Sequence, residues 1–513
     1  MNASPADTVL VVGAGIMGAG IAQIAAQAGH PVFLFDARAG AASEARGKLR
    51  ETLSGLAAKG KLSTSDVEET ISRIEPITSL QAASTARLVV EAIVERLDAK
   101  RALFRELEDV VATDAVLATN TSSISVTAIA NGLRHPGRVV GMHFFNPVPL
   151  MRLVEVVSGL QTDAAVAEAV FELARTWRKV PVHAKSTPGF IVNRIARPFY
   201  AETLALLQEQ AADPETVDRC LTGAGFRMGA CELMDLIGHD TNFSVTQSVY
   251  EANFFDKRFV PSLVQRELVD GGLLGRKSGR GFYAYPRTLT PAPSAPPAPL
   301  VKPKFVTLHG SGSDADRLFG LVERALAGGD ARLAREARSG WTGLEADGAR
   351  LVLTDGRPAF EIARDAPTPD VAVFDLPLVW DAISGPPVLA YAVHVSSSTG
   401  WKAQVPAWLA AFGFDGVAVA DTPGLVVART VAMLINEAAD AVQQGVCNRD
   451  GANVAMKLGV NYPAGPFDWL DAWGARNVAS VIRELDVAYR GERYRLSPWL
   501  RCRAATSRQG AQA

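Results

Sequence analysis

Cysteine is scarce in this chain. Only four cysteines occur among 513 residues, namely Cys220, Cys231, Cys447 and Cys502. No two of them have the spacing of metal ligands, and so few thiols do not make a disulfide framework. We therefore expect four reduced thiols, no bound metal and a cytoplasmic location.

Long hydrophobic runs and an excess of charge are missing as well. No apolar run is long enough to span a bilayer. Residues 1–8 lack the basic and then apolar segments of a secretory signal, so none is expected. The formal net charge is −2, which gives no basic field for nucleic acid or for an acidic membrane. These absences leave a globular protein of three or four domains, at roughly 100–200 residues per domain.

One stretch of the sequence is repeated. The tripeptide Thr187-Pro188-Gly189 recurs 235 positions later as Thr422-Pro423-Gly424. Further on, Gly229 and Asp235 match Gly465 and Asp471 at an offset of 236. The chance alternative is that two Ala-rich helical stretches happen to be alike. A repeat of this length indicates a duplicated helical domain.

The repeat, together with composition, predicts five segments. Residues 1–185 alternate apolar strands with helical stretches, as in an α/β domain with a parallel sheet. Residues 186–285 and 421–505 are the two helical copies, and the Pro-rich residues 286–303 form a linker. Residues 304–420 are predicted to be a shorter, degenerate α/β domain, with strand-like runs at 351–353, 371–374 and 388–391.

The N-terminal segment carries a dinucleotide fingerprint. An apolar run at 9–12 leads into Gly13-Ala14-Gly15-Ile16-Met17-Gly18, a helical pattern follows, and a second strand ends in Asp36. The three glycines suit a tight turn, the approach of a pyrophosphate and close helix–strand packing. Asp36 would bind the ribose hydroxyls and favours NAD over NADP, although Arg38 could accommodate a 2′-phosphate. A flavin site or a decayed pocket is the alternative.

Polar residues at other strand ends suggest the chemistry. Strand-like runs at 116–119 and 139–142 lead into Ser122 and His143, and a third run at 153–157 contains Glu155. Oxidation of an alcohol needs a base near neutral pKa, which histidine supplies, and a carboxylate at its other nitrogen would fix the tautomer. Taken singly, each residue also has a plain alternative: a satisfied polar group, a solvent-facing acid or a helix cap.

The combination of motifs resembles a known family. Residues 1–286 resemble the NAD-dependent L-3-hydroxyacyl-CoA dehydrogenases, which have a Rossmann-type NAD-binding domain followed by an all-α domain. The segments that carry the resemblance are Gly13–Gly18, Val89–Glu95, Asn120–Ser123, His143–Pro147, Leu153–Val157, Thr187–Arg194 and Leu274–Tyr283.

The resemblance implies roles for individual residues. His143 would be the general base, Glu155 its orienting partner, and Ser122 and Asn193 hydrogen-bonding groups around the substrate. The nicotinamide side of NAD would contact Glu95, Lys100, Ser122, Asn146 and Lys277. In the family a helical hairpin holds coenzyme A; Thr52 and Lys59 match it loosely, and solvent is the plain alternative for Lys59.

Two departures from the family pattern qualify these expectations. The first copy reads Gly229-Ala230-Cys231-Glu232-Leu233 where the family has Gly-Pro-Phe-Glu-Leu, which puts the acyl-chain preference in doubt. In the second module Ala428 replaces Asn193, His394 has no following glutamate, and no glycine fingerprint precedes residue 420 in a strand context. We expect a catalytically silent second module that supplies, within the chain, the helical partner that single-module relatives take from a second subunit. A homodimer is the alternative.

Other functions remain as alternatives. The two-module layout resembles the long bacterial 3-hydroxyacyl-CoA dehydrogenases of phenylacetate breakdown, whose substrate would be 3-hydroxyadipyl-CoA or a short relative such as 3-hydroxybutyryl-CoA. A structural or binding protein on the same scaffold is one rival, and a dehydrogenase of small hydroxy acids without coenzyme A is another. A hydratase fusion is disfavoured because no crotonase-like segment accompanies the module.

Overall fold

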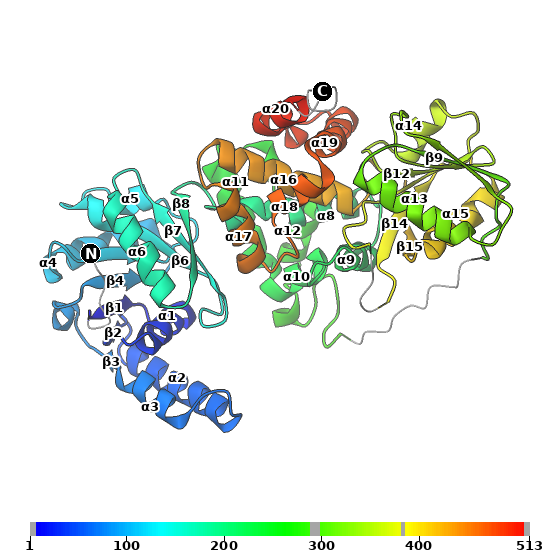
Figure 1. The fold of residues 1–513 in the computed structure, drawn as a ribbon. Helices are drawn as coiled ribbons and strands as arrows, with labels where there is room; N and C mark the ends of the chain where they lie inside the picture. Colours follow the sequence, from blue (N-terminus) through cyan, green and yellow to red (C-terminus); the bar gives the residue numbers. More distant parts are fainter. Residues whose placement is uncertain (1–6, 288–297, 381–384, 507–513) are drawn as a thin grey trace. The chain divides into compact units, whose positions relative to one another are not determined.

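The computed structural model describes residues 7–287, 298–380 and 385–506. They form two compact units (Figure 1). The first unit comprises residues up to 194 together with 441–460, and the second comprises 195–440 together with the residues from 461 onward. Residues 288–297 of the predicted linker lie outside the described residues.

The first unit contains an eight-stranded sheet in the order β3-β2-β1-β4-β5-β6-β7-β8. Strands β1 to β6 run parallel, β7 is antiparallel to β6, and β8 is parallel to β7. The first six positions have the order of a dinucleotide-binding sheet. The strands are β1 (Val9–Val12), β2 (Val32–Phe35), β3 (Ile74–Pro76), β4 (Leu88–Glu91), β5 (Val116–Thr119), β6 (Val139–Phe144), β7 (Leu153–Ser158) and β8 (Val180–Lys185).

Helices surround this sheet, which explains why its central strands are made mostly of apolar residues. Strands β1, β4 and β5 are buried along their whole length because a parallel sheet is covered on both faces, and they are apolar except for Glu91 and Thr119 at the ends of β4 and β5. Ser63 and Asp66 form a capping box at the start of α3. The helices are α1 (Ile16–Gln27), α2 (Ala41–Ala58), α3 (Thr64–Ser72), α4 (Leu97–Val110), α5 (Val126–Ala130) and α6 (Ala164–Thr176).

The two predicted helical copies are both helical. The first contains α7 (Val192–Ile195), α8 (Arg197–Gln208), α9 (Pro214–Gly223), α10 (Ala230–Ile237), α11 (His239–Ala252) and α12 (Leu263–Asp270). The second contains α16 (Val427–Gln443), α17 (Arg449–Gly459), α18 (Pro466–Trp473), α19 (Ala475–Tyr489) and α20 (Pro498–Thr506). The predicted fold class, an α/β domain and an all-α domain followed by a second such pair, is confirmed.

The second unit contains a seven-stranded sheet in the order β10-β9-β11-β12-β13-β14-β15. The three strand-like runs found in the sequence lie in β12, β13 and β14. The strands are β9 (Phe305–His309), β10 (Arg332–Glu336), β11 (Gly343–Ala346), β12 (Ala349–Leu353), β13 (Val371–Phe374), β14 (Val388–Val393) and β15 (Asp415–Ala418). The helices of this domain are α13 (Ser313–Leu326), α14 (Ala359–Arg364) and α15 (Thr399–Ala411).

One expectation about this second sheet is wrong. Strand β9 runs through Gly310-Ser311-Gly312 directly into α13, so a partial glycine fingerprint does stand in a strand–helix context. The sequence did not reveal the strand because buried and partly exposed residues alternate along it instead of forming one apolar run. The fingerprint is nevertheless altered: Asp314 and Asp316 occupy the first turn of α13, where a phosphate would bind.

Each sheet packs against a helix of the other module's helical copy. Helix α17 of the second copy packs on β7 and β8, and α9 of the first copy packs on β14. The Lys185 amide donates to the Val446 carbonyl (2.9 Å), and the Ala420 amide donates to the Ala211 carbonyl (2.9 Å). Lys185 and Ala420 are separated by the repeat offset of 235 positions, and so are Ala211 and Val446. The duplicated segments therefore make matching contacts in the two units.

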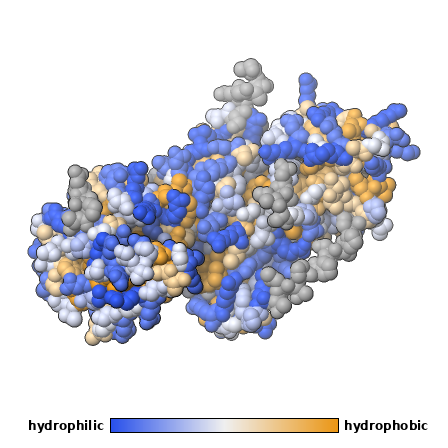
Figure 2. Space-filling model, turned by 60° about the horizontal axis from the view of Figure 1, so that its bottom comes forward, coloured by the Kyte–Doolittle hydropathy of each residue, from blue (hydrophilic) through white to orange (hydrophobic). Residues whose placement is uncertain are grey.

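The surface is mostly polar on the face drawn in Figure 2, with hydrophobic residues in patches between hydrophilic ones. Among residues 7–287, 298–380 and 385–506, no helix has both the length and the apolar character needed to cross a membrane.

Candidate active site

The glycine loop after β1 has the geometry of a phosphate-binding turn. Gly13 has φ +106°, and a side chain there would lie 2.4 Å from the Ala92 carbonyl oxygen. At Gly18 a side chain would overlap the Gly13 carbonyl oxygen, so helix and strand need glycine for their close approach. At Gly15, in contrast, a side chain would meet nothing within 4 Å. This open space beside the start of α1 fits a pyrophosphate approaching the helix N-terminus.

Asp36 lies at the end of β2, where the ribose of a dinucleotide would bind. Its carboxylate accepts hydrogen bonds from the backbone amides of Ala14 (2.7 Å) and Arg38 (2.9 Å). The Arg38 guanidinium forms an exposed ion pair with Glu44 (2.8 Å). The acid is thus held at the loop while the arginine has a carboxylate partner of its own, an arrangement that suits NAD.

Two exposed apolar side chains lie beyond the carboxyl ends of β1 and β4, one at the first position of α1 and one in the loop after β4. Ile16 is 78% exposed and Val94 is 60% exposed. Ile16 and Met17 were predicted to be cofactor contacts, whereas Val94 appeared only as part of the family motif Val89–Glu95.

A buried ion pair lies behind the Ser122 loop. The Lys100 ammonium contacts Glu91 (2.6 Å) and Glu95 (3.2 Å), and both Lys100 and Glu91 are buried. Glu91 also accepts from the Thr119 hydroxyl (2.6 Å). Lys100 was predicted to touch NAD; 1% of its side chain is exposed, and its ammonium contacts the two glutamates. Glu91 was missed, although an acid that ends an apolar strand was visible in the sequence.

Glu95 faces the loop that carries Ser122. One of its carboxylate oxygens accepts from the Thr121 hydroxyl (2.6 Å) and from the Ser122 amide (3.0 Å). Burial raises the pKa of this carboxyl, but the charge of Lys100 and the hydrogen bonds from the loop outweigh burial and hold the pKa below its usual range. Glu95 is therefore ionised, next to the hydroxyl of Ser122.

His143 and Glu155 face each other across an antiparallel strand pair. The register of β6 and β7 places them opposite one another, and His143 Nδ1 lies 2.6 Å from a Glu155 carboxylate oxygen. Both side chains are buried, and the rings of Phe145 and Phe190 lie 4.6 and 5.7 Å from the imidazole. A hydrogen bond at Nδ1 leaves Nε2 as the nitrogen that can accept a proton.

The second carboxylate oxygen of Glu155 has a different task. It accepts hydrogen bonds from the backbone amides of Ile191 (3.0 Å) and Val192 (2.9 Å), at the start of α7. Asn193, half-buried, follows directly on this helix, so Glu155 links the histidine to the segment that carries Asn193. Asn146 is exposed in the loop after β6.

Residues of the second helical copy also lie beside this dyad, and sequence reasoning missed them. Arg194 donates to the Gln444 side-chain oxygen (2.8 Å). Burial, with a contribution from the negative charge of Glu155, raises the pKa of the Cys447 thiol to about 12. The corresponding pair in the second unit is Arg429 with Glu209 (3.0 Å). Only the repeat offset could have pointed to these pairs.

The predicted coenzyme A hairpin consists of α2 and α3. A groove of about 390 Å³ lies between the two helices, and Arg50, Ser54 and Thr64 are among its lining residues. Thr52 and Lys59 are exposed, and the Thr52 hydroxyl donates to the Lys48 carbonyl (2.9 Å). Arg50 is a cation of this groove that the sequence interpretation did not select.

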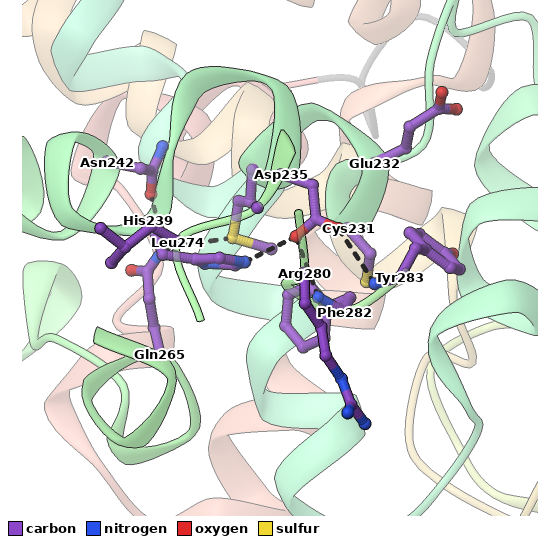
Figure 3. A network of polar contacts seen from close by, with 12 residues as sticks. Cys231, Glu232, Asp235, His239, Asn242, Gln265, Leu274, Arg280, Phe282 and Tyr283 are labelled. Atoms are coloured by element: carbon purple, nitrogen blue, oxygen red, sulfur yellow. Dashed lines mark hydrogen bonds and ion pairs between the residues drawn. The ribbon is translucent and has the colours of Figure 1, made fainter. Parts of the chain in front are cut away.

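Lys277 belongs to the second unit, where a buried network holds its segment. Asp235 accepts hydrogen bonds from the backbone amides of Phe282 (2.9 Å) and Tyr283 (3.0 Å), and His239 Nε2 lies 2.8 Å from the same carboxylate (Figure 3). Lys277 itself is 45% exposed and pairs with Asp240 (2.5 Å).

The turn that departs from the family pattern is organised by Asp218. Its carboxylate accepts from the backbone amides of Cys231 (2.8 Å) and Glu232 (2.9 Å) and from the Tyr283 hydroxyl (2.8 Å). Burial outweighs these hydrogen bonds and raises the pKa of Asp218 to about 6. A side chain at Gly229 would overlap Asp218, so this turn is closely packed.

In the second module an aspartate stands where His143 stands in the first. Asp375 directly follows β13, opposite Ala390 on β14, in the register that His143 and Glu155 have on β6 and β7. Its carboxylate accepts from the amides of Val426 (2.9 Å) and Val427 (2.6 Å). His394 lies half-buried after β14 and contacts the Pro369 carbonyl (3.2 Å). The counterpart of His143 is thus Asp375, not His394.

Comparisons with known proteins agree with this geometry. Residues 8–187 match the family model of the 3-hydroxyacyl-CoA dehydrogenase NAD binding domain, and residues 189–285 and 424–513 both match the C-terminal domain of that enzyme. Residues 351–423 match the reduced Rossmann-fold domain of 3-hydroxybutyryl-CoA dehydrogenase. The duplication and the NAD-binding domain inferred from the sequence are thereby confirmed.

Two relatives cover nearly the whole chain, and a third covers its first half. The 3-hydroxyadipyl-CoA dehydrogenase of Escherichia coli K12 is 42% identical, over 97% of both chains. A crystal structure described as 3-hydroxybutyryl-CoA dehydrogenase from Escherichia coli K12 matches with a TM-score of 0.87 and 40% identity, over 98% of this chain and 99% of that one. The pig mitochondrial hydroxyacyl-coenzyme A dehydrogenase is 41% identical over 54% of this chain and 90% of its own. This chain belongs to the 3-hydroxyacyl-CoA dehydrogenase family.

Proposed function

We propose that the chain oxidises an L-3-hydroxyacyl-CoA to the 3-oxoacyl-CoA, with His143 as the general base. The observation that carries this proposal is the buried contact of 2.6 Å between His143 Nδ1 and Glu155. NAD⁺, when bound, accepts the hydride that leaves the hydroxyl-bearing carbon. The Nε2 atom of His143 takes the hydroxyl proton, and Glu155 stabilises the imidazolium that forms.

The surrounding residues orient the reactants in this proposal. Ser122 and Asn193 hydrogen-bond the substrate oxygen, because one lies on the loop after β5 and the other on the helix that Glu155 anchors. Glu95, Asn146 and Lys277 contact the nicotinamide side of NAD, with Lys100 acting through Glu95. Thr52 and Lys59 on the α2–α3 hairpin hold coenzyme A.

The test of the base is a His143→Asn variant, assayed by NADH absorbance with acetoacetyl-CoA as the substrate of the reverse reaction. We expect turnover to fall by about 10²–10⁴, the contribution of a positioned general acid–base group. The exposed His183→Asn variant is the matched control and should keep full activity. Substantial turnover in the His143 variant would refute the assigned role and would point to a second active module.

We also propose that the acyl chain is short, with 3-hydroxyadipyl-CoA or 3-hydroxybutyryl-CoA as the substrate. The support is that whole-chain relatives carry both names. A profile of kcat/KM across 3-hydroxyacyl-CoA lengths, including the adipyl derivative, tests this point. A maximum at a long unsubstituted chain would contradict it.

The second module is proposed to be catalytically silent. Asp375 replaces the histidine, Ala390 faces it where Glu155 would be, and Ala428 replaces Asn193. The second module therefore lacks a histidine at this position and a carboxylate opposite to orient it. The loss of turnover expected for His143→Asn tests this claim as well.

The role proposed for the second helical copy is that of an internal partner. In each unit a sheet packs against a helix of the other copy, with hydrogen bonds that match at the repeat offset. A second subunit would have to compete for surfaces that the chain already covers. The mass in solution tests this model: a dimer formed through the first helical copies would refute it.

A further inference from the structure

A buried arginine in the first helical copy has no carboxylate partner. Arg197 begins α8 and is 5% exposed. Its single hydrogen bond within the described residues runs from Nη1 to the Thr246 hydroxyl (3.0 Å), and its Nε is buried without a partner. The guanidinium also lies 4.9 Å from the Tyr200 ring. One hydrogen bond and one ring contact do not balance a buried charge.

Other buried arginines of the same unit are neutralised by acids. Arg429 pairs with Glu202 (2.7 Å), and Arg258 pairs with Glu437 (3.1 Å). For Arg197, in contrast, burial lowers the pKa, and the ionisable groups beside it are the phenols of Tyr200 and Tyr462, whose own pKa values burial raises. Of these three arginines, Arg197 is therefore the one whose charge no acid of the described residues balances.

Arg197 lines a small cavity with a polar wall. The cavity has a volume of about 90 Å³, and Gln208, Thr246, Ser262 and Arg493 are among its lining residues. Arg493 is a second cation of the wall and is already paired with Glu202 (3.0 Å), so this pair does not balance the charge of Arg197. At roughly 30 Å³ per water molecule, the space holds about three waters or one small anion.

We propose that this cavity binds a carboxylate group, with Arg197 as its counter-ion. A guanidinium binds a carboxylate through parallel N–H groups, and the hydroxyl and amide side chains of the wall complete the shell. The carboxylate belongs to a free small anion. The proposal does not rest on the proposed dehydrogenase function.

The first arm of the test uses the full chain without substrate. The melting temperature is followed in a zwitterionic buffer against sodium acetate and against the bulkier sodium trimethylacetate, at constant ionic strength. We expect a saturable rise of a few degrees with acetate alone. Arg197→Met should lose this response and should melt higher than the wild type without acetate, because it removes an unpaired buried charge. The exposed Arg175→Met variant should respond like the wild type.

The second arm uses the activity assay to check that the variant is folded. Arg197→Met should change KM for 3-hydroxyadipyl-CoA and for 3-hydroxyhexanoyl-CoA alike, because the site is not part of the substrate site. Equal effects of acetate and trimethylacetate on the wild type would overturn the proposal. The wild-type titration decides the first arm even if the variant does not fold, and a failure of the proposed dehydrogenase activity would leave that arm intact.

Discussion

Replacing Glu155 with glutamine separates its two tasks. One carboxylate oxygen accepts the amides of Ile191 and Val192, and the other faces His143 Nδ1 at 2.6 Å. In Glu155→Gln the carbonyl oxygen can keep both backbone hydrogen bonds. The amide nitrogen then faces Nδ1 as a donor, which forces the imidazole proton onto Nε2. The nitrogen that should accept the substrate proton is thereby blocked.

The expected fall in kcat follows from the changed tautomer of the His143 imidazole. In the serine-protease triad, the amide replacement of the orienting acid lowers kcat by about 10⁴. The same reversal here should lower kcat by about 10³–10⁴, equivalent to roughly 4–5.5 kcal/mol of activation free energy. Stability should change little because the two helix amides stay satisfied. Steady-state NADH absorbance and urea unfolding measure the two effects separately.

Asp375→Asn is the matched control in the second module. Asp375 accepts four backbone amides, those of Leu376 and of residues 426–428, and has no histidine beside it. An asparagine there leaves two buried amides without an acceptor, at about 1–3 kcal/mol each. We expect lower stability with an unchanged kcat, the opposite of the Glu155→Gln result. The reasoning is refuted if Glu155→Gln keeps kcat within tenfold of the wild type, or if it loses activity only as far as it unfolds.

Three further predictions concern stability. Gly459→Ala should lower the free energy of unfolding by about 1–3 kcal/mol and should also lower kcat, because the added methyl would lie 2.7 Å from a side chain of β7. Gly491→Ala is the control: the nearest atom to the added methyl lies at 3.8 Å, so neither quantity should change. Lys100→Met should lower the free energy of unfolding by about 3–5 kcal/mol in urea titrations, since it leaves Glu91 buried and unpaired; a smaller loss would mean that Glu91 is protonated. The folded-state pKa of Asp218, about 6, lies above its unfolded value of 3.8, so the contribution of this group to the free energy of unfolding is complete at low pH and is lost as pH rises through 6. Relative to Asp218→Asn, the free energy of unfolding of the wild type should fall by about 1.3 kcal/mol between pH 5 and pH 7. A difference between the two proteins that does not change with pH would contradict the raised pKa.

Much of the first module could be predicted because its signals are local. The apolar run of β1, the glycines after it and Asp36 lie within one continuous stretch, and each has a physical reason. His143 and Glu155 were selected as a pair, and the strand register brings them together. Their resemblance to a family decided what the residues singly left open.

The parts that escaped prediction depend on contacts between distant segments. Lys100 looks like a surface lysine on a helix, and only the sheet shows that it is buried between Glu91 and Glu95. Strand β9 is half-exposed, so its residues alternate and the glycines after it did not stand out. The contact of Arg194 with Gln444 spans 250 positions, a distance at which no local pattern can operate.

The two modules together indicate what the fold requires and what the chemistry adds. In both, the helix that follows the Thr-Pro-Gly turn begins with buried amides, and a carboxylate from the sheet accepts them. Buried amides without an acceptor are costly, so some acid is needed whether or not a reaction occurs. In the second module Asp375 serves only this purpose, from the position of the histidine. In the first module the acid comes from the neighbouring strand, so the position that Asp375 occupies in the second module is free for His143. The spare oxygen of Glu155 faces this histidine, as the proposed base requires. The same substitution at Glu155 and at Asp375 should therefore affect activity in one module and stability alone in the other.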